Sequence, residues 1–124
     1  MNIRILVVDD SPSIRQMISI ALKSASYLVT TVESGQAALA LCERMLFDLI
    51  ITDQDMTKMD GLTLIGSIRN LNCYRDVPIL LITNETSLQA KEQGKHAGAT
   101  ECLVKPLNPQ HLLSLAARIL PEAV

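Results

Sequence analysis

The sequence predicts an α/β protein built on a parallel sheet with helices over both faces. Five short apolar runs alternate with five segments of helical periodicity along the 124 residues. Strands that alternate with helices in this way are joined by right-handed crossovers and therefore run parallel. Most of the runs are almost continuously apolar, as expected of strands that are buried on both faces.

The five runs have the length and composition of buried strands. They read IRILVVDD, LVTTVES, DLIITD, VPILLIT and ECLVK, at residues 3–10, 28–34, 48–53, 77–83 and 101–105. The fourth run has Pro78 in its second position, and proline is tolerated at the start of a strand.

The first three helices are predicted from their opening residues and from the apolar pattern that follows. Ser11 and Pro12 are a capping residue and a proline at the opening helical position. Ser34 can cap a second helix, whose apolar residues at helical spacing reach Met45. Gly61 opens a third helix that has apolar residues on one face.

The fourth and fifth helices differ in the breadth of their apolar faces. Thr86 or Ser87 can cap the fourth, whose few apolar residues lie among lysine, glutamate and glycine, so we expect it to be the loosest helix. Asn108 followed by Pro109 opens the fifth, which has a broad apolar face and ends at Pro121.

Two strand orders of doubly wound sheets compete for a chain of this pattern. The flavodoxin-like order 2-1-3-4-5 is favoured, because it makes residues 28–34 an edge strand and sets the other four strands side by side. Those four runs end on acidic, hydroxyl or amino side chains, whereas residues 28–34 end on nothing comparably reactive. The length fits a single domain over residues 1–124.

Charge and hydropathy exclude several classes of function. The net charge of −2 lacks the basic excess that direct nucleic-acid binding needs. The longest apolar stretches have the length of strands, so we expect no membrane insertion, no secretory leader and a cytoplasmic protein. Cys42, Cys73 and Cys102 are odd in number and form no CxxC pair, which favours reduced thiols over a disulfide or a zinc site.

The ends of four predicted strands carry complementary chemistry. Asp9 and Asp10 end the first, Asp53 the third and Thr83 the fourth, while Lys105 ends the fifth. The carboxyl ends of parallel strands meet at one edge of the sheet, so these side chains should converge there. Three carboxylates repel one another unless a cation relieves them, and Mg²⁺ prefers such oxygen ligands.

A carboxylate beside Mg²⁺ can act as a nucleophile toward phosphorus, and Asp53 is the candidate. Thr83 and Lys105 are suited to holding the oxygens of a phosphoryl group. Each of these residues alone is more often a turn former, a helix cap or a solvated side chain. Their joint placement at four separate strand ends favours the phosphoryl-transfer interpretation.

Four segments together resemble the receiver domains of bacterial two-component response regulators, most closely the stand-alone type represented by the chemotaxis regulator. They are VVDDSPSIR at 7–15, ITDQDMTKMDGL at 51–62, LLITNE at 80–85 and LVKP at 103–106. The resemblance covers nearly the whole chain and implies a receiver domain without an output domain.

The resemblance also implies a role for each site residue. Asp53 would be the phosphoacceptor, Thr83 the switch hydroxyl and Lys105 the lysine that contacts the phosphate. The metal ligands for Mg²⁺ would be Asp9, Asp10, Asp53 and the backbone carbonyl of Asp55. A cis peptide bond between Lys105 and Pro106 is a further expectation from the family.

A receiver of this type would take a phosphoryl group from a histidine kinase or a phosphotransfer protein. It would catalyse its own phosphorylation and slow dephosphorylation without being a turnover enzyme. Phosphorylation would change partner binding at a face formed by the fourth helix, fifth strand and fifth helix, where Lys91, Lys95, His96 and His111 are expected to be exposed. Chemotaxis is one of several pathways that such a receiver can serve.

Three positions depart from the pattern of the family. Cys102 stands where the family usually has Tyr or Phe, so aromatic gating is absent. Asn84 is larger than the residue that commonly follows the switch threonine, and it is expected to alter access to the aspartate or the lifetime of the phosphorylated state. Thr57 replaces a proline and should loosen its loop.

Two other functions remain open from the sequence. The run from Asp53 to Thr57 also matches the DxDxT motif of haloacid dehalogenase-like phosphatases, in which the second aspartate, here Asp55, acts as acid and base. The order argues against this, because the DxD motif of those enzymes follows their first strand. A pseudo-receiver that binds a partner without accepting phosphate is the second alternative, because of Asn84 and Cys102.

Overall fold

A computed structural model describes residues 2–120, which form one five-stranded parallel sheet in the order β2-β1-β3-β4-β5. The predicted strand order is therefore confirmed. The strands are β1 (Arg4–Val8), β2 (Leu28–Val32), β3 (Leu49–Asp53), β4 (Ile79–Thr83) and β5 (Glu101–Val104). β3 and β4 are buried along their whole length, whereas the edge strand β2 is not.

Five α-helices follow the strands within the described residues, and a short 3₁₀-helix precedes β4. They are α1 (Pro12–Ser24), α2 (Gly35–Cys42), α3 (Gly61–Arg69), η1 (Asn72–Tyr74), α4 (Leu88–Ala97) and α5 (Pro109–Ile119). The predicted caps at Ser11, Ser34 and Asn108 accept backbone N–H groups of their helices, and the fourth cap is Ser87. The expected stop at Pro121 lies outside the described residues.

The second helix is shorter than the sequence predicts, because α2 ends at Cys42 and does not continue to Met45. The chain turns there toward β3, and the hydroxyl of the buried Tyr74 fixes that turn. It accepts a hydrogen bond from Phe47 N–H at 3.0 Å and donates one to the carbonyl of Met45. An aromatic residue in η1 thus holds the entry to β3.

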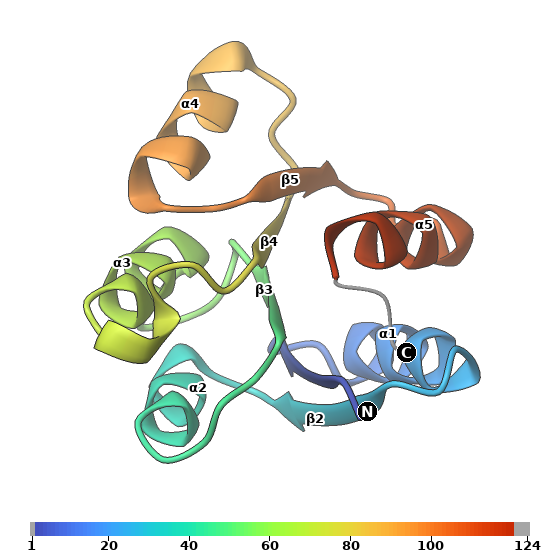
Figure 1. The fold of residues 1–124 in the computed structure, drawn as a ribbon. Helices are drawn as coiled ribbons and strands as arrows, with labels where there is room; N and C mark the ends of the chain where they lie inside the picture. The colour runs from blue at the N-terminus through green and yellow to red at the C-terminus, as the bar shows by residue number, and fades with distance from the viewer. Residues whose placement is uncertain (1, 121–124) are drawn as a thin grey trace.

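The sheet separates two apolar layers (Figure 1). Along each strand alternate side chains point to opposite faces. Ile5 of β1 packs with α1 and α5 on one face, while Leu6 packs on the face that α2 and α3 cover. α4 follows β4 and lies next to α3 and β5.

Three further observations bear on the sequence predictions. The Lys105–Pro106 peptide bond is cis, as the family resemblance implies. Cys42, Cys73 and Cys102 are free thiols. Across residues 2–120 we find no helix with the length and apolarity needed to cross a membrane.

Candidate functional site

The site residues lie where parallel strands end. Asp9 directly follows β1, Asp53 is the last residue of β3, Thr83 is the last residue of β4, and Lys105 directly follows β5. The register pairs Asp53 with Ile82 and Thr83 with Val104, so these ends lie at the same edge of the sheet. The burial of Asp9 and Asp53 follows from that position, since β1 and β3 are covered on both faces of the sheet.

Three carboxylates gather at this edge. Asp9, Asp10 and Asp53 each place an oxygen within 4.8 Å of the others. Asp9 is 1 % exposed and Asp53 is 2 % exposed, while Asp10 is open to solvent. This is the convergence that the strand order predicts.

The two carboxylate oxygens of Asp9 lie in different environments. Its Oδ1 accepts a hydrogen bond from Ser11 N–H at 2.9 Å, whereas its buried Oδ2 has no hydrogen-bond partner in the described part of the chain. Burial raises the pKa of Asp9 above its usual range, and the charges of Asp53 and Asp10 add to that rise against the opposing effects of Ser11 and Lys105. A buried carboxylate oxygen without a partner, beside two other acids, fits a hard divalent cation such as Mg²⁺.

Lys105 brings a positive charge next to Asp53. Its Nζ lies 2.8 Å from Oδ1 of Asp53, which makes an ion pair with the ammonium and has no other partner within residues 2–120. Burial lowers the pKa of Lys105, but the hydrogen bond and the charge of Asp53 outweigh that effect and the pKa lies above its ordinary value. The ammonium therefore stays charged at neutral pH.

The backbone after Asp53 is held by the side chain of Gln54, which the sequence reading did not single out. Its Oε1 accepts the N–H of Leu62 at 2.8 Å, and its Nε2 donates to Oδ2 of Asp60 at 3.3 Å. A Cβ on Gly61 would lie 2.5 Å from the carbonyl oxygen of Asp53. Only glycine lets α3 begin this close to the end of β3.

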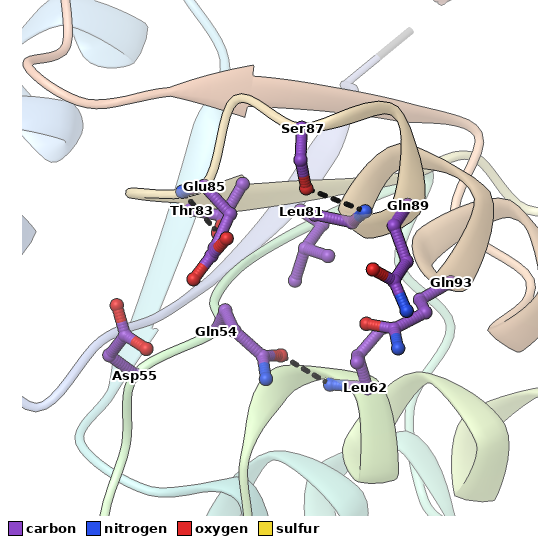
Figure 2. Close-up of a pocket in the computed structure, with 10 residues that line it drawn as sticks. Gln54, Asp55, Leu62, Leu81, Thr83, Glu85, Ser87, Gln89 and Gln93 are labelled. Atoms are coloured by element: carbon purple, nitrogen blue, oxygen red, sulfur yellow. Dashed lines mark hydrogen bonds between the residues drawn. The ribbon is translucent and has the colours of Figure 1, made fainter.

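Thr83 points toward the loop that follows it. Its Oγ1 accepts a hydrogen bond from Glu85 N–H at 3.1 Å. Thr83 also lines a hollow of about 330 Å³ between this loop, α4 and the loop after β3. Figure 2 shows Gln54, Gln89 and Gln93 around that hollow, with Leu62 and Leu81 beside them.

The two residues that flank the site at the surface are joined to each other. Asn84 Nδ2 donates to Oδ2 of Asp55 at 3.1 Å, which links the loop after β4 to the loop after β3. The sequence placed both residues at strand ends, but it carried no signal for this hydrogen bond. A backbone carbonyl of Asp55 facing a metal stays a prediction.

Cys102 occupies the position where the family usually has an aromatic residue. It is half-buried on β5, and its Sγ lies 2.8 Å from where a Cβ on Gly94 of α4 would be. Burial raises the pKa of the Cys102 thiol. The side chain therefore packs as a small apolar group against α4, as the sequence predicts.

Comparison with known proteins agrees with the fold. Residues 5–117 match the family model of the response regulator receiver domain. The chain is 34% identical over 117 residues to the DNA-binding dual master transcriptional regulator RpaA of Synechocystis, which covers 94% of this chain and 48% of RpaA. It thus spans about half the length of that relative. A 14.6 kDa protein of Leptolyngbya boryana is 33% identical over 90% of this chain and 85% of its own.

Solved structures give the same result. The chemotaxis protein CheY4 of Vibrio cholerae is 44% identical, with a TM-score of 0.93 over 97% of this chain and 100% of its own. The receiver domain of the sensor histidine kinase PA1611 of Pseudomonas aeruginosa, solved with a magnesium ion in its active-site cleft, is 30% identical. Its TM-score is 0.87 over 96% of this chain and 98% of its own. This chain belongs to the family of response regulator receiver domains.

Proposed function

We propose that Asp53 is the phosphoacceptor of this receiver domain and that it takes a phosphoryl group from the phosphohistidine of a histidine kinase or a phosphotransfer protein. The P–N bond of the donor breaks, a P–O bond forms to the carboxylate of Asp53, and the histidine departs. The observation that carries the proposal is the buried carboxylate of Asp53, which lies 2.8 Å from Lys105 and beside two further acids. Chemotaxis is one pathway open to such a protein.

The chain's own residues prepare Asp53 for this reaction. Asp9, Asp10 and Asp53, with the backbone carbonyl of Asp55, would hold Mg²⁺, which neutralises oxygen charge during phosphoryl transfer when it is bound. Lys105 offers an ammonium that can move from the carboxylate of Asp53 to a phosphoryl oxygen. Phosphorylation thus exchanges one ion pair for another around a group that carries roughly −1.5 to −2 charges.

Thr83 is the residue that would report the modification to the surface. Its hydroxyl bonds to Glu85 in this structure, and it can instead donate to a phosphoryl oxygen. That exchange would pull the loop after β4 toward the site. The attached phosphoryl group shifts the equilibrium between two conformations only to the extent that its contacts are more favourable in one of them.

In this proposal, the surface that binds downstream partners is formed by α4, β5 and α5. Lys91, Lys95, His96 and His111 are exposed there, as the sequence predicts. Capture of binding partners with and without beryllofluoride, a mimic of the phosphoryl group, would test the role of this surface. A Lys91→Glu, Lys95→Glu variant should lose the partners that depend on beryllofluoride while Asp53 is still phosphorylated. The proposal places the protein in the cytoplasm, where ATP-dependent kinases work.

Incubation with Mg²⁺ and a small phosphodonor, followed by intact mass and site mapping, tests the phosphoacceptor. We expect one acid-stable, base-labile adduct on Asp53, its loss in Asp53→Asn, and its retention in Asp76→Asn, which removes an exposed acid that precedes β4, at the opposite end of that strand from Thr83. An unlabelled native protein, or a label that survives Asp53→Asn, would contradict the assignment.

The two alternative functions are not favoured. Asp53 ends β3 and the acidic pair follows β1, which is the reverse of the order in haloacid dehalogenase-like phosphatases. Rapid hydrolysis of phosphomonoesters over many turnovers would favour the phosphatase hypothesis instead. A pseudo-receiver would bind Mg²⁺ without ever carrying the adduct on Asp53.

A further inference from the structure

The two ends of α4 are attached to the protein very differently. At its C-terminal end the helix stops at Gly98, whose backbone has a φ of +116° in the left-handed region. The carbonyl of Gly98 accepts two hydrogen bonds from the guanidinium of Arg69, from Nε at 3.0 Å and from Nη2 at 2.8 Å. This end of α4 is therefore bound to the last residue of α3.

Arg69 joins three parts of the chain through backbone carbonyls. Its Nη1 donates to the carbonyls of Tyr74 at 2.7 Å and Val77 at 2.6 Å. No carboxylate lies within salt-bridge distance of Arg69 in the described residues. The guanidinium donates instead to carbonyls at the last residue of η1, just before β4 and just past the C-terminal end of α4, where the helix dipole is negative. The planar fork of arginine suits this arrangement in a way that lysine does not.

Gly98 is required twice in this contact. Its positive φ favours glycine, and a Cβ there would also lie 2.8 Å from Cγ of Arg69. The next turn is tied to β4 as well, since Thr100 N–H donates to the carbonyl of Ile79 at 2.8 Å and Thr100 Oγ1 accepts Ile79 N–H at 3.0 Å. The C-terminal end of α4 is thus anchored to both α3 and the start of β4.

Among residues 2–120, nothing anchors the N-terminal end of α4 in a comparable way. Ser87 makes only local hydrogen bonds there, from Ala90 N–H to its side chain and from Lys91 N–H to its carbonyl. Leu88 is 79 % exposed. The hollow of about 330 Å³ lies beneath this half of the helix, beside Thr83 (Figure 2).

We propose that Arg69 is a positioning residue that makes Gly98 the pivot of α4, so that phosphorylation tilts the helix by moving its Ser87 end over the hollow beside Thr83. The inference rests on the proposed function of Asp53. Thr83 and Ser87 are separated by a short loop, so a shift of Thr83 pulls on the free end of the helix. The anchored end then converts that pull into a rotation of the face that carries Lys91 and Lys95.

Hydrogen exchange of the full chain tests the anchor without any ligand. After correction for intrinsic rates, amides from Gly98 to Thr100 should exchange roughly tenfold or more slowly than those from Lys91 to Gln93. Arg69→Gln should remove that difference while amides of β1 and β3 keep their native rates. Arg69→Lys, which keeps the charge without the fork, should restore it only in part.

The matched control is Arg75→Gln, since Arg75 is exposed and bonds only to the side chain of Asn72. It should leave the pattern unchanged. The positioning role would be contradicted if the difference in exchange rate between the two ends of α4 survives Arg69→Gln. It would also be contradicted if exchange of the core amides accelerates by the same factor as that of Gly98. If Arg69→Gln does not fold, native protein and Arg69→Lys decide the question in the same way.

The second arm adds Mg²⁺ and beryllofluoride, with fluorine NMR to show that the anion is bound. In the native protein, beryllofluoride should change the exchange rates of the loop before α4 and of the first part of α4, and these changes should end before Gly94. In Arg69→Gln the changes should extend through Gly98. Native changes that reach Gly98 equally would overturn the pivot. Absence of a bound-fluoride signal would instead count against the function proposed for Asp53, and the first arm would still decide the anchor.

Discussion

Asn84 and Asp55 form a hydrogen bond of 3.1 Å that joins the loops after β4 and β3 at the rim of the candidate site. Both side chains are exposed, so the bond contributes little to global stability. It does hold the loop after β4 to the loop after β3 beside the candidate site. We therefore expect the larger side chain of Asn84 to limit access to Asp53 as well as to link the two loops.

We predict that Asn84→Ala and Asp55→Ala each change the rate of phosphorylation of Asp53 by a small phosphodonor, with an increase of about two- to fivefold for Asn84→Ala. The double variant should be no faster than the faster single variant, because both remove the same bond. Asp55→Asn keeps an acceptor for Asn84 and isolates the charge. If the decay rate of the phosphorylated form is unchanged in Asp55→Asn, the charge of Asp55 has no role in hydrolysis.

We expect the buried carboxylate of Asp9 to lower the free energy of unfolding at neutral pH when no metal is bound. Its pKa is raised, so folding disfavours ionisation of Asp9 relative to the unfolded chain, and the contribution of the neutral acid to stability is lost as the pH rises above the ordinary value of 3.8. Asp9→Asn should therefore increase the free energy of unfolding by about 1 kcal/mol at pH 7 and by almost nothing well below pH 3.8.

Thermal unfolding at a series of pH values measures this difference between the variant and the native protein. Adding Mg²⁺ should raise the Tm of the native protein and leave that of Asp9→Asn nearly unchanged, because binding to the folded state stabilises it. A variant that is less stable than the native protein at pH 7 would show that the carboxylate of Asp9 is favourable without a cation.

Gly61 and Gly66 in α3 offer a matched pair of glycine substitutions. A Cβ on Gly61 would meet backbone atoms of Asp53 and Gln54 at 2.5 and 2.9 Å, whereas a Cβ on Gly66 meets nothing within 4 Å. We expect Gly61→Ala to destabilise the fold by about 2 kcal/mol or more and to weaken Mg²⁺ binding. Gly66→Ala should stabilise it by about 0.5 to 1 kcal/mol. Urea unfolding of both variants checks the contrast, and similar effects at the two positions would refute it.

Lys58 adopts a left-handed backbone conformation, with a φ of 69°, in the loop between β3 and α3. This conformation is unfavourable for lysine and better tolerated by asparagine. Lys58→Asn should therefore stabilise the protein by about 0.5 to 1 kcal/mol. Lys58→Ala removes the same charge without relieving the backbone and serves as the control. Equal stabilities for the two variants would mean that the conformation carries little strain.

The sheet and the convergence of its strand ends could be predicted because they follow from alternation alone. Once parallel strands are recognised, Asp9, Asp53 and Lys105 must lie at one edge, and only the strand order decides which are neighbours. The phosphoryl-transfer chemistry was inferred from the residue types at these strand ends, and their specific roles in a receiver came from resemblance to a family. Neither inference required knowledge of any side-chain contact.

Arg69 could not be found in this way. A basic residue in the last turn of a helix ordinarily complements the helix dipole, and nothing in the local pattern distinguishes Arg69 from that case. Its partner Gly98 is 29 positions away and is brought near by the crossover of α4. The role of Gln54 was hidden for a similar reason, since its acceptor and donor contacts depend on how closely α3 approaches β3.

The division of the interior into two apolar layers has a consequence for how relatives of this protein can diverge. Side chains that α1 and α5 cover are separated by the sheet from those beneath α2 and α3. Distant substitutions combine almost independently. Substitutions on the side of α1 and α5 can therefore change binding properties during evolution. The contact between α3 and α4 on the other side can stay the same.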